Sequence, residues 1–274
     1  MRARFARLLA CLSLLVVVLA TSAAHAAAPV ETRVTATATA LVTIATVGGS
    51  LKVTGWNRPE VTVSTDGQAP VLTALDGGAR VQIQGGLGDA TLEVHVPKGA
   101  HVEARSIGAG VSVQGVDGPV QVSTATGNVD VTGGSGDVEV SSISGDVTLA
   151  LGKADVRATT VSGRLSVRCT GGGTVFAKAV SGALRVAGGV MTRIEGRSVS
   201  GDLDVDATPQ GSGPFVLRTH SGALRVTLPK NAPVAVQARS FSGHVDDGGD
   251  DAGAAAGAVL SLATFSGDIH VVRR

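Results

Sequence analysis

The stretch "SVSGDLDV" (198–205) recurs as near-copies along the second half of the chain. The copies are "TVSGRLSV" (160–167), "AVSGALRV" (179–186), "THSGALRV" (219–226) and "TFSGDIHV" (264–271). Each joins a Ser-Gly step to alternating apolar and polar residues, which is the pattern of a strand with one buried face. Self-similarity at a period of about 20 residues is typical of a solenoid.

The glycine of each step marks a corner where the chain reverses direction. Glycine adopts positive φ without a Cβ penalty, and no helix follows that would make the step a phosphate cradle. The corner glycines are Gly127, Gly145, Gly163, Gly182, Gly201, Gly222, Gly243 and Gly267. We therefore predict an all-β chain that forms one β-solenoid (β-helix) with about 18–21 residues per coil.

Each coil is predicted to contain two strands and two turns. The segments "GPVQV", "GNVDV", "GDVEV" and "GDVTL" begin at 118, 127, 136 and 145, so a strand and a turn take nine residues. The residues two and four after each corner are Val, Leu or Ile, and Asp247 is the one exception. Strands of successive coils are expected to pair, with a rise of about 4.8 Å per coil.

The two ends of the chain are less regular than its middle. Residues 27–98 are predicted to form an N-terminal β cap with irregular first coils, and residues 99–274 the regular solenoid. The Gly/Asp/Ala-rich segment 246–258 is predicted to be a loop that enlarges the last coil. An uncapped coil exposes a strand edge, so Arg273 and Arg274 are expected to supply edge charge at the C-terminus.

Residues 1–26 have the form of a secretory signal peptide. Three arginines precede an apolar run (8–20), and Ala24-His25-Ala26 provides an A-x-A cleavage site. The run is too short for a good membrane span. Cys11 stands in a loose lipoprotein box with too few apolar residues before it, which disfavours lipid anchoring. We predict an exported protein, periplasmic or extracellular, with no transmembrane segment after cleavage.

The charge and cysteine content of the mature chain narrow its function. Without residues 1–26 the chain has 20 basic and 22 acidic side chains. This balance gives no sign of nucleic acid or an anionic membrane as a partner. Only Cys169 remains, so no internal disulfide is possible, and we expect this cysteine to be a packing residue.

Further motifs place the chain beside a known family. They are "GGSLKVTGWNRPEVTV" (48–63), "HVPKGAHVEARS" (95–106), "TLPKNAPVAVQARS" (227–240) and the serial "VSGDLDV" steps. With these motifs, roughly residues 30–274 resemble the bacterial candidate-adhesin family of exported β-helical proteins, a domain of unknown function. The resemblance implies a β-solenoid and brings no catalytic residue.

A column of basic side chains is the leading candidate for a binding surface. Lys178, Arg197, Arg218 and Arg239 each lie four residues before a corner, on the outward face. Stacked at about 4.8 Å they repel unless paired. They either pair with Asp202, Asp204 or Asp206, which is the favoured interpretation, or form a strip that binds acidic glycans or a partner protein.

Trp56 is the only tryptophan and the second candidate. We expect it to act as a hydrophobic lid on the solenoid end, and stacking against a sugar is the alternative.

Metal and cofactor sites are not predicted. "GGSGDVEV" (133–140) approaches a calcium-binding nonapeptide, but Asp137 falls one residue early and so changes face. The acidic loop residues Asp246, Asp247, Asp250 and Asp251 are expected to be solvated. His220 and His244, expected near each other on adjacent coils, have no third ligand for zinc.

Catalysis has little support in the sequence. The outward acids are scattered and no Ser/His/Asp arrangement follows from the register. We therefore predict an exported, non-catalytic β-solenoid that acts as an envelope scaffold or adhesin-like binding surface for a cell-envelope glycan or protein. A periplasmic ligand-binding or stress-sensing module is the alternative, and a polysaccharide-active enzyme is disfavoured.

Overall fold

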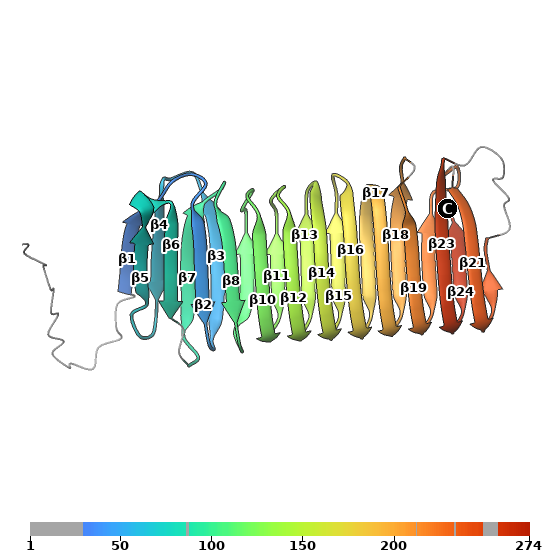
Figure 1. Cartoon of the computed structure of the whole chain (residues 1–274), viewed down its shortest axis with the longest axis horizontal. Helices are drawn as coiled ribbons and strands as arrows, with labels where there is room; N and C mark the ends of the chain where they lie inside the picture. The colour runs from blue at the N-terminus through green and yellow to red at the C-terminus, as the bar shows by residue number, and fades with distance from the viewer. Residues whose placement is uncertain (1–29, 86–87, 212, 233, 249–256) are drawn as a thin grey trace, which may run out of the picture.

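The computed structural model describes residues 30–85, 88–211, 213–232, 234–248 and 257–274. The predicted signal peptide and most of the predicted loop at 246–258 lie outside these residues. Apart from one 3-10 turn, η1 (Asp76–Gly78), the described residues form strands and short connections. They stack into one elongated rack of coils (Figure 1). The predicted all-β solenoid is confirmed.

Every coil contributes one strand to each of two facing sheets. The first eight strands are β1 (Val30–Thr35), β2 (Leu41–Thr46), β3 (Ser50–Trp56), β4 (Glu60–Thr65), β5 (Val71–Leu75), β6 (Arg80–Gly85), β7 (Thr91–Pro97) and β8 (His101–Ser106). The next eight are β9 (Gly110–Gln114), β10 (Val120–Thr126), β11 (Val129–Thr132), β12 (Val138–Ser144), β13 (Val147–Leu151), β14 (Ala154–Ser162), β15 (Leu165–Cys169) and β16 (Gly173–Ser181). The last eight are β17 (Leu184–Ser200), β18 (Leu203–Pro209), β19 (Phe215–Ser221), β20 (Leu224–Leu228), β21 (Val234–Ser242), β22 (Val245–Asp246), β23 (Ala258–Ser266) and β24 (Ile269–Arg273).

Sheet I contains the strands that precede the corners, and sheet II those that follow them. Sheet I has the order β5-β6-β2-β8-β10-β12-β14-β16-β17-β19-β23-β21. Sheet II has the order β1-β4-β7-β3-β9-β11-β13-β15-β17-β18-β20-β24-β22. The long strand β17 bends and belongs to both. All pairs are parallel except β1–β4, β4–β7 and β5–β6 at the N-terminal end.

The core is a set of columns in which the same position of each coil lies over the next. Leu165, Leu184, Leu203, Leu224 and Ile269 follow one another in register on sheet II, and all are buried. The two sheets pack directly on each other, because a Cβ on Gly196 of sheet I would lie 3.1 Å from Leu203 Cδ2 of sheet II. Valine and leucine fill the narrow space between the sheets, so the fold needs few aromatic residues.

The corner glycines are required for two separate reasons. All eight have φ between +115° and +157°. A Cβ added at Gly145, Gly163 or Gly182 would also lie 2.1–2.3 Å from the carbonyl oxygen of the corner glycine of the neighbouring coil. Only glycine satisfies both the backbone conformation and the close approach of coils.

Hydroxyl side chains complete the corners. In the column three residues before each glycine, the hydroxyls of Thr124, Thr160 and Thr219 donate to the carbonyls of Thr126, Ser162 and Ser221. The serine of the Ser-Gly step bonds to the neighbouring coil: Ser162 Oγ donates to the carbonyl of Ile143 at 3.2 Å. These bonds satisfy backbone groups that the strand ladders leave free at the turn.

The coils do not stack in chain order at either end, which corrects the expectation that successive coils pair throughout. The first coil, β2–β3, lies between β6–β7 and β8–β9 (Figure 1). The last coil, β23–β24, lies between β19–β20 and β21–β22. Both terminal coils are therefore held between other coils, and the division of the chain at residue 98 stays a prediction.

This order explains two departures from the sequence expectations. Asp247 follows β22, which is the outermost strand of sheet II, so no apolar residue is needed at its position. Arg273 and Arg274 lie on the inserted coil and do not protect a free edge. Arg273 Nη2 donates to the Val234 carbonyl at 3.2 Å, and Arg274 pairs with Asp206 at 2.5 Å.

Candidate binding surface

Three of the four predicted basic residues stand on consecutive strands of sheet I. Lys178 on β16 is in register with Arg197 on β17, and Arg197 with Arg218 on β19. Arg239 was expected next to Arg218, but Ala263 of the inserted strand β23 separates them. The predicted column of four is therefore a run of three cations followed by an alanine and a fourth cation.

The aspartates expected to neutralise this column have other partners. Asp204 pairs with Arg185 on sheet II at 3.8 Å, and Asp206 pairs with Arg274. Asp202 Oδ1 accepts the backbone N–H of Ala223 at 2.8 Å.

Within the column itself, Arg197 pairs with Glu195 of its own strand at 2.6 Å. In the described part of the chain, Lys178, Arg218 and Arg239 form no ion pair. The column therefore keeps most of its positive charge facing solvent.

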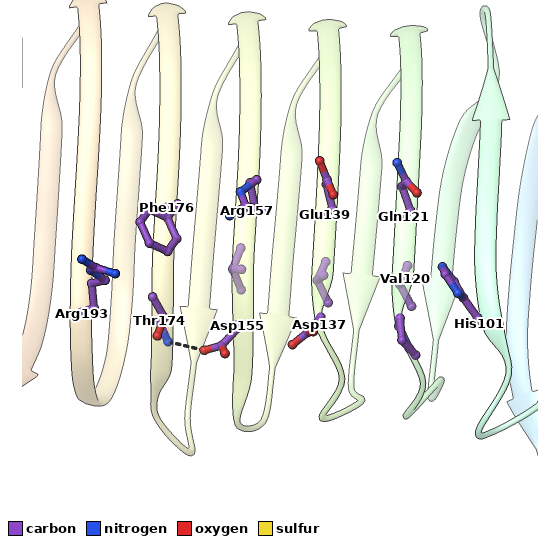
Figure 2. Close-up of a pocket in the computed structure, with 13 residues that line it drawn as sticks. His101, Val120, Gln121, Asp137, Glu139, Asp155, Arg157, Thr174, Phe176 and Arg193 are labelled. Carbon is purple, nitrogen blue, oxygen red and sulfur yellow. Dashed lines mark hydrogen bonds between the residues drawn. The ribbon is translucent and has the colours of Figure 1, made fainter. Parts of the chain in front are cut away.

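A second cluster borders the basic column on the same face. Phe176 lies between two guanidinium groups, with Arg157 at 5.7 Å and Arg193 at 5.2 Å from its ring centroid. Figure 2 shows these side chains along successive strands, with Asp137 and Glu139 farther toward the N-terminal end. Asp155 Oδ1 accepts the backbone N–H of Thr174 at 3.0 Å.

This cluster lines a shallow groove of about 560 Å³. The sequence analysis missed it because Arg157, Phe176 and Arg193 are unremarkable one by one. The signal that identifies them is the register, which places Arg157 opposite Phe176 on adjacent strands. With Lys178, Arg197 and Arg218, the outer face of sheet I carries five cations over four neighbouring strands.

The sequence analysis also missed a line of apolar side chains at the corner. The residue two positions before each corner points outward, and in most coils it is valine, isoleucine or phenylalanine. Eight of the fourteen exposed large apolar side chains in the described residues belong to this line: Val47, Ile107, Ile143, Val161, Val180, Val199, Phe265 and Phe241. The motif itself, an apolar residue before Ser-Gly, was visible in the sequence.

Trp56 does not lie at the end of the stack, where the lid was expected. Its strand, β3, is covered on both sides by β7 and β9. The ring stacks on His95 with centroids 5.1 Å apart, Arg58 covers it at 5.0 Å, and Nε1 donates to the Glu60 carbonyl. These contacts explain the tryptophan as a packing residue, and no ligand is needed to account for it.

The cysteine and the two histidines considered as reactive or metal-binding residues are explained by their packing. Cys169 is buried, and burial, with a smaller contribution from the Asp155 charge, raises the pKa of its thiol to about 11. His220 stacks on Phe265, and the inserted coil separates it from His244, so the expected proximity of the two histidines is wrong. No cluster of three or more metal-ligating side chains occurs among the described residues.

The comparisons with known proteins bear on the family and the fold. The model of the Toastrack DUF4097 family matches residues 27–272. No curated protein matches the chain. None of the described segments is a helix able to span a membrane.

The solved structures that match the chain include two with a described role. One is described as a candidate cell adhesion protein from Clostridium sporogenes, at 10% identity and a TM-score of 0.22, over 90% of this chain and 100% of that one. The other is a candidate lipid binding protein from Parabacteroides distasonis, at 11% identity and a TM-score of 0.27, over 90% and 96%. Neither likeness is close enough to carry a role over to this protein. The family match spans nearly the whole chain and agrees with the stacked fold, so the protein belongs to the Toastrack DUF4097 family.

Proposed function

We propose that the protein is an exported, non-catalytic β-solenoid that binds an anionic component of the cell envelope through the basic column of sheet I. The observation that carries the proposal is the run of Lys178, Arg197 and Arg218 on three consecutive strands. Like charges held about 4.8 Å apart repel one another, so the arrangement favours a partner that supplies several negative charges in a row.

The surroundings of the column support a binding role over a catalytic one. The residues near it are Thr159, Val180, Val199 and His220, which line an open hollow with the three cations. A hydrolase would need an activated nucleophile or a pair of acids in a cleft. Cys169, the one thiol after residue 26, is buried and keeps its proton at neutral pH.

Export is part of the proposal and is supported by the leader-like residues 1–26, with the mature chain starting near residue 27. Expression of the full chain followed by N-terminal sequencing of the exported product tests this step, and a product that retains residues 1–26 would contradict it.

Binding is tested by co-sedimentation of the mature protein with cell-envelope fragments. The variant Lys178→Ser, Arg197→Ser, Arg218→Ser should lose most of its binding, and wild-type binding should weaken as salt is raised. The matched control is Arg168→Ser, Arg185→Ser, Arg225→Ser, which removes the same charge from exposed positions of sheet II. Equal losses in both variants would refute the site, and no sedimentation of the wild type would refute the function.

A further inference from the structure

The corner of sheet I carries an apolar ridge that the basic column alone does not explain. We define the ridge as the outward residues two positions before each corner, in spatial order Val47, Ile107, Ala125, Ile143, Val161, Val180, Val199, His220, Phe265 and Phe241. The ten positions follow one another at about 4.8 Å, so the ridge extends for about 43 Å. A soluble protein rarely exposes so continuous an apolar line without a partner.

The ridge side chains are exposed to solvent, and those at the C-terminal end stack on one another. Its valines, isoleucines and phenylalanines are 44–79% exposed. At the C-terminal end, Phe265 stacks between His220 and Phe241, with ring centroids 5.0 and 4.8 Å apart. The ridge therefore ends in an aromatic ladder that contains two phenylalanines, and phenylalanine is one of the side chains that interfacial elements insert among lipid headgroups.

Several backbone carbonyls of the ridge already accept a hydrogen bond from a side-chain hydroxyl. The hydroxyls of Thr126, Ser162 and Ser181 donate to the carbonyls of ridge residues on the neighbouring coil, at 3.1, 3.2 and 3.3 Å. The accepting residues are Ile107, Ile143 and Val161. A carbonyl that already has a protein donor costs less to remove from water.

The charged residues nearest the ridge on the sheet I side are all basic, and two of them, Arg105 and Arg197, pair with Glu103 and Glu195 farther from the ridge. Two residues before each ridge position lies the column that contains Arg105, Lys178, Arg197, Arg218 and Arg239, and no acidic residue occupies it on any described strand. On the far side of the corner, the carboxylates of Asp146, Asp202 and Asp268 accept backbone N–H groups of the adjacent coil at 2.8 Å. Insertion of the ridge would bring the cations to the depth of lipid phosphates.

We propose that the anionic component of the envelope is the surface of a phospholipid bilayer, on which the solenoid lies with its apolar ridge inserted at the interface and its basic column against the phosphates. The inference rests on the proposed function and names its partner, which the overall charge of the mature chain does not indicate but the local column of cations on sheet I does. A soluble acidic glycan would neutralise the column but leave the ridge in water. Two antiparallel copies that face each other would bury the ridge, but their basic columns would then lie against each other. In a parallel pair the cations would instead face Asp146, Asp202 and Asp268 of the second copy, whose carboxylates already accept backbone N–H groups.

Sucrose-loaded vesicles test the inference by co-sedimentation. Wild-type protein should bind vesicles of equal parts phosphatidylglycerol and phosphatidylcholine and should not bind pure phosphatidylcholine. The partition coefficient is expected to fall about tenfold for every one to two cations removed. The triple variant Lys178→Ser, Arg197→Ser, Arg218→Ser should therefore lower it about 100-fold. The ridge variant Val180→Ser, Val199→Ser, Phe241→Ser should lower it at least tenfold.

A matched control separates the ridge from general apolarity. Val190→Ser, Val259→Ser, Val272→Ser removes three side chains that are 40–48% exposed elsewhere on the surface, and it should bind as the wild type does. Circular dichroism and thermal melting of every variant identify any loss of binding that comes from unfolding. If the ridge variant binds vesicles as tightly as the wild type, insertion is refuted.

Two further outcomes would overturn the inference without touching the proposed function. Arginine-dependent sedimentation of the wild type with envelope fragments, without binding to anionic vesicles, would identify an acidic glycan of the envelope as the partner. Alternatively, analytical ultracentrifugation could find a dimer that the ridge variant dissociates, with no vesicle binding, which would assign the ridge to a second copy. Failure to bind envelope fragments at all would remove the proposed function itself.

Discussion

Gly163→Ala provides the sharpest test of why the repeat contains a glycine at every corner. Gly163 has φ of +116°, a conformation that costs an alanine about 1–2 kcal/mol. Its new Cβ would lie 2.2 Å from the Gly145 carbonyl oxygen, so one coil must shift and strain at least one inter-coil hydrogen bond, at about 0.5–1.5 kcal/mol. The free energy of unfolding should fall by about 1.5–3.5 kcal/mol in total.

Gly77→Ala is the control that isolates the close approach. Gly77 also has positive φ, +66°, but a Cβ there meets no atom within 4 Å, so only the conformational cost of about 1–2 kcal/mol applies. Urea unfolding followed by circular dichroism compares the two variants. Hydrogen exchange should place the additional loss at Gly163 in the coils next to it, because solenoid stability is local. Equal destabilisation by the two substitutions would refute the close-approach argument.

Three further predictions follow from the core, the thiol and the coil order. Leu203→Ala removes a buried side chain between Leu184 and Leu224 and should cost about 2–5 kcal/mol in urea unfolding; a cost below 1 kcal/mol, by the same scale, would contradict the packing. Cys169 should resist thiol reagents at pH 8 until the protein unfolds, as a colorimetric thiol assay would record. Its folded pKa is raised from 9.0 to about 11, so the stability that the protonated thiol contributes is full below pH 9 and is lost as pH rises toward 11. In alkaline thermal melts, Cys169→Ala should abolish this pH dependence of stability. Deletion of 258–274 should raise hydrogen exchange in both β20 and β22, and protection kept in β20 would contradict the inserted order.

The corners and the core columns could be predicted because they depend on local pattern. A Ser-Gly step followed by period-two alternation defines a turn and a strand whatever lies beside them, and Gly163, Leu165 and Val167 have the predicted roles. The order of the coils could not be predicted in this way. Each coil offers nearly the same edge of valine and leucine columns, so the repeat alone does not determine which coil stacks on which.

The candidate surface was predicted in part for a related reason. Outward position follows from alternation, so the basic residues were placed on the correct face. Their partners depend on contacts that the alternation does not encode: Arg197 takes Glu195 from its own strand, and Arg274 takes Asp206 from a coil far away in the sequence. The apolar ridge was not predicted because period-two alternation assigns the outward positions to polar residues, although an apolar residue precedes six of the seven Ser-Gly steps at the corners.

Parallel stacking turns any repeated outward residue into a line of equal groups, and this determines how the surface should be studied. A single substitution in the basic column removes one charge among several, which lowers binding to an anionic surface by about fivefold. Contributions along such a line add as free energies, so three substitutions lower binding by the product of their separate factors. A scan of single alanines would therefore underestimate the column and the ridge. A logarithm of the partition coefficient that falls in proportion to the number of consecutive coils altered is the behaviour that distinguishes a linear surface from a single pocket.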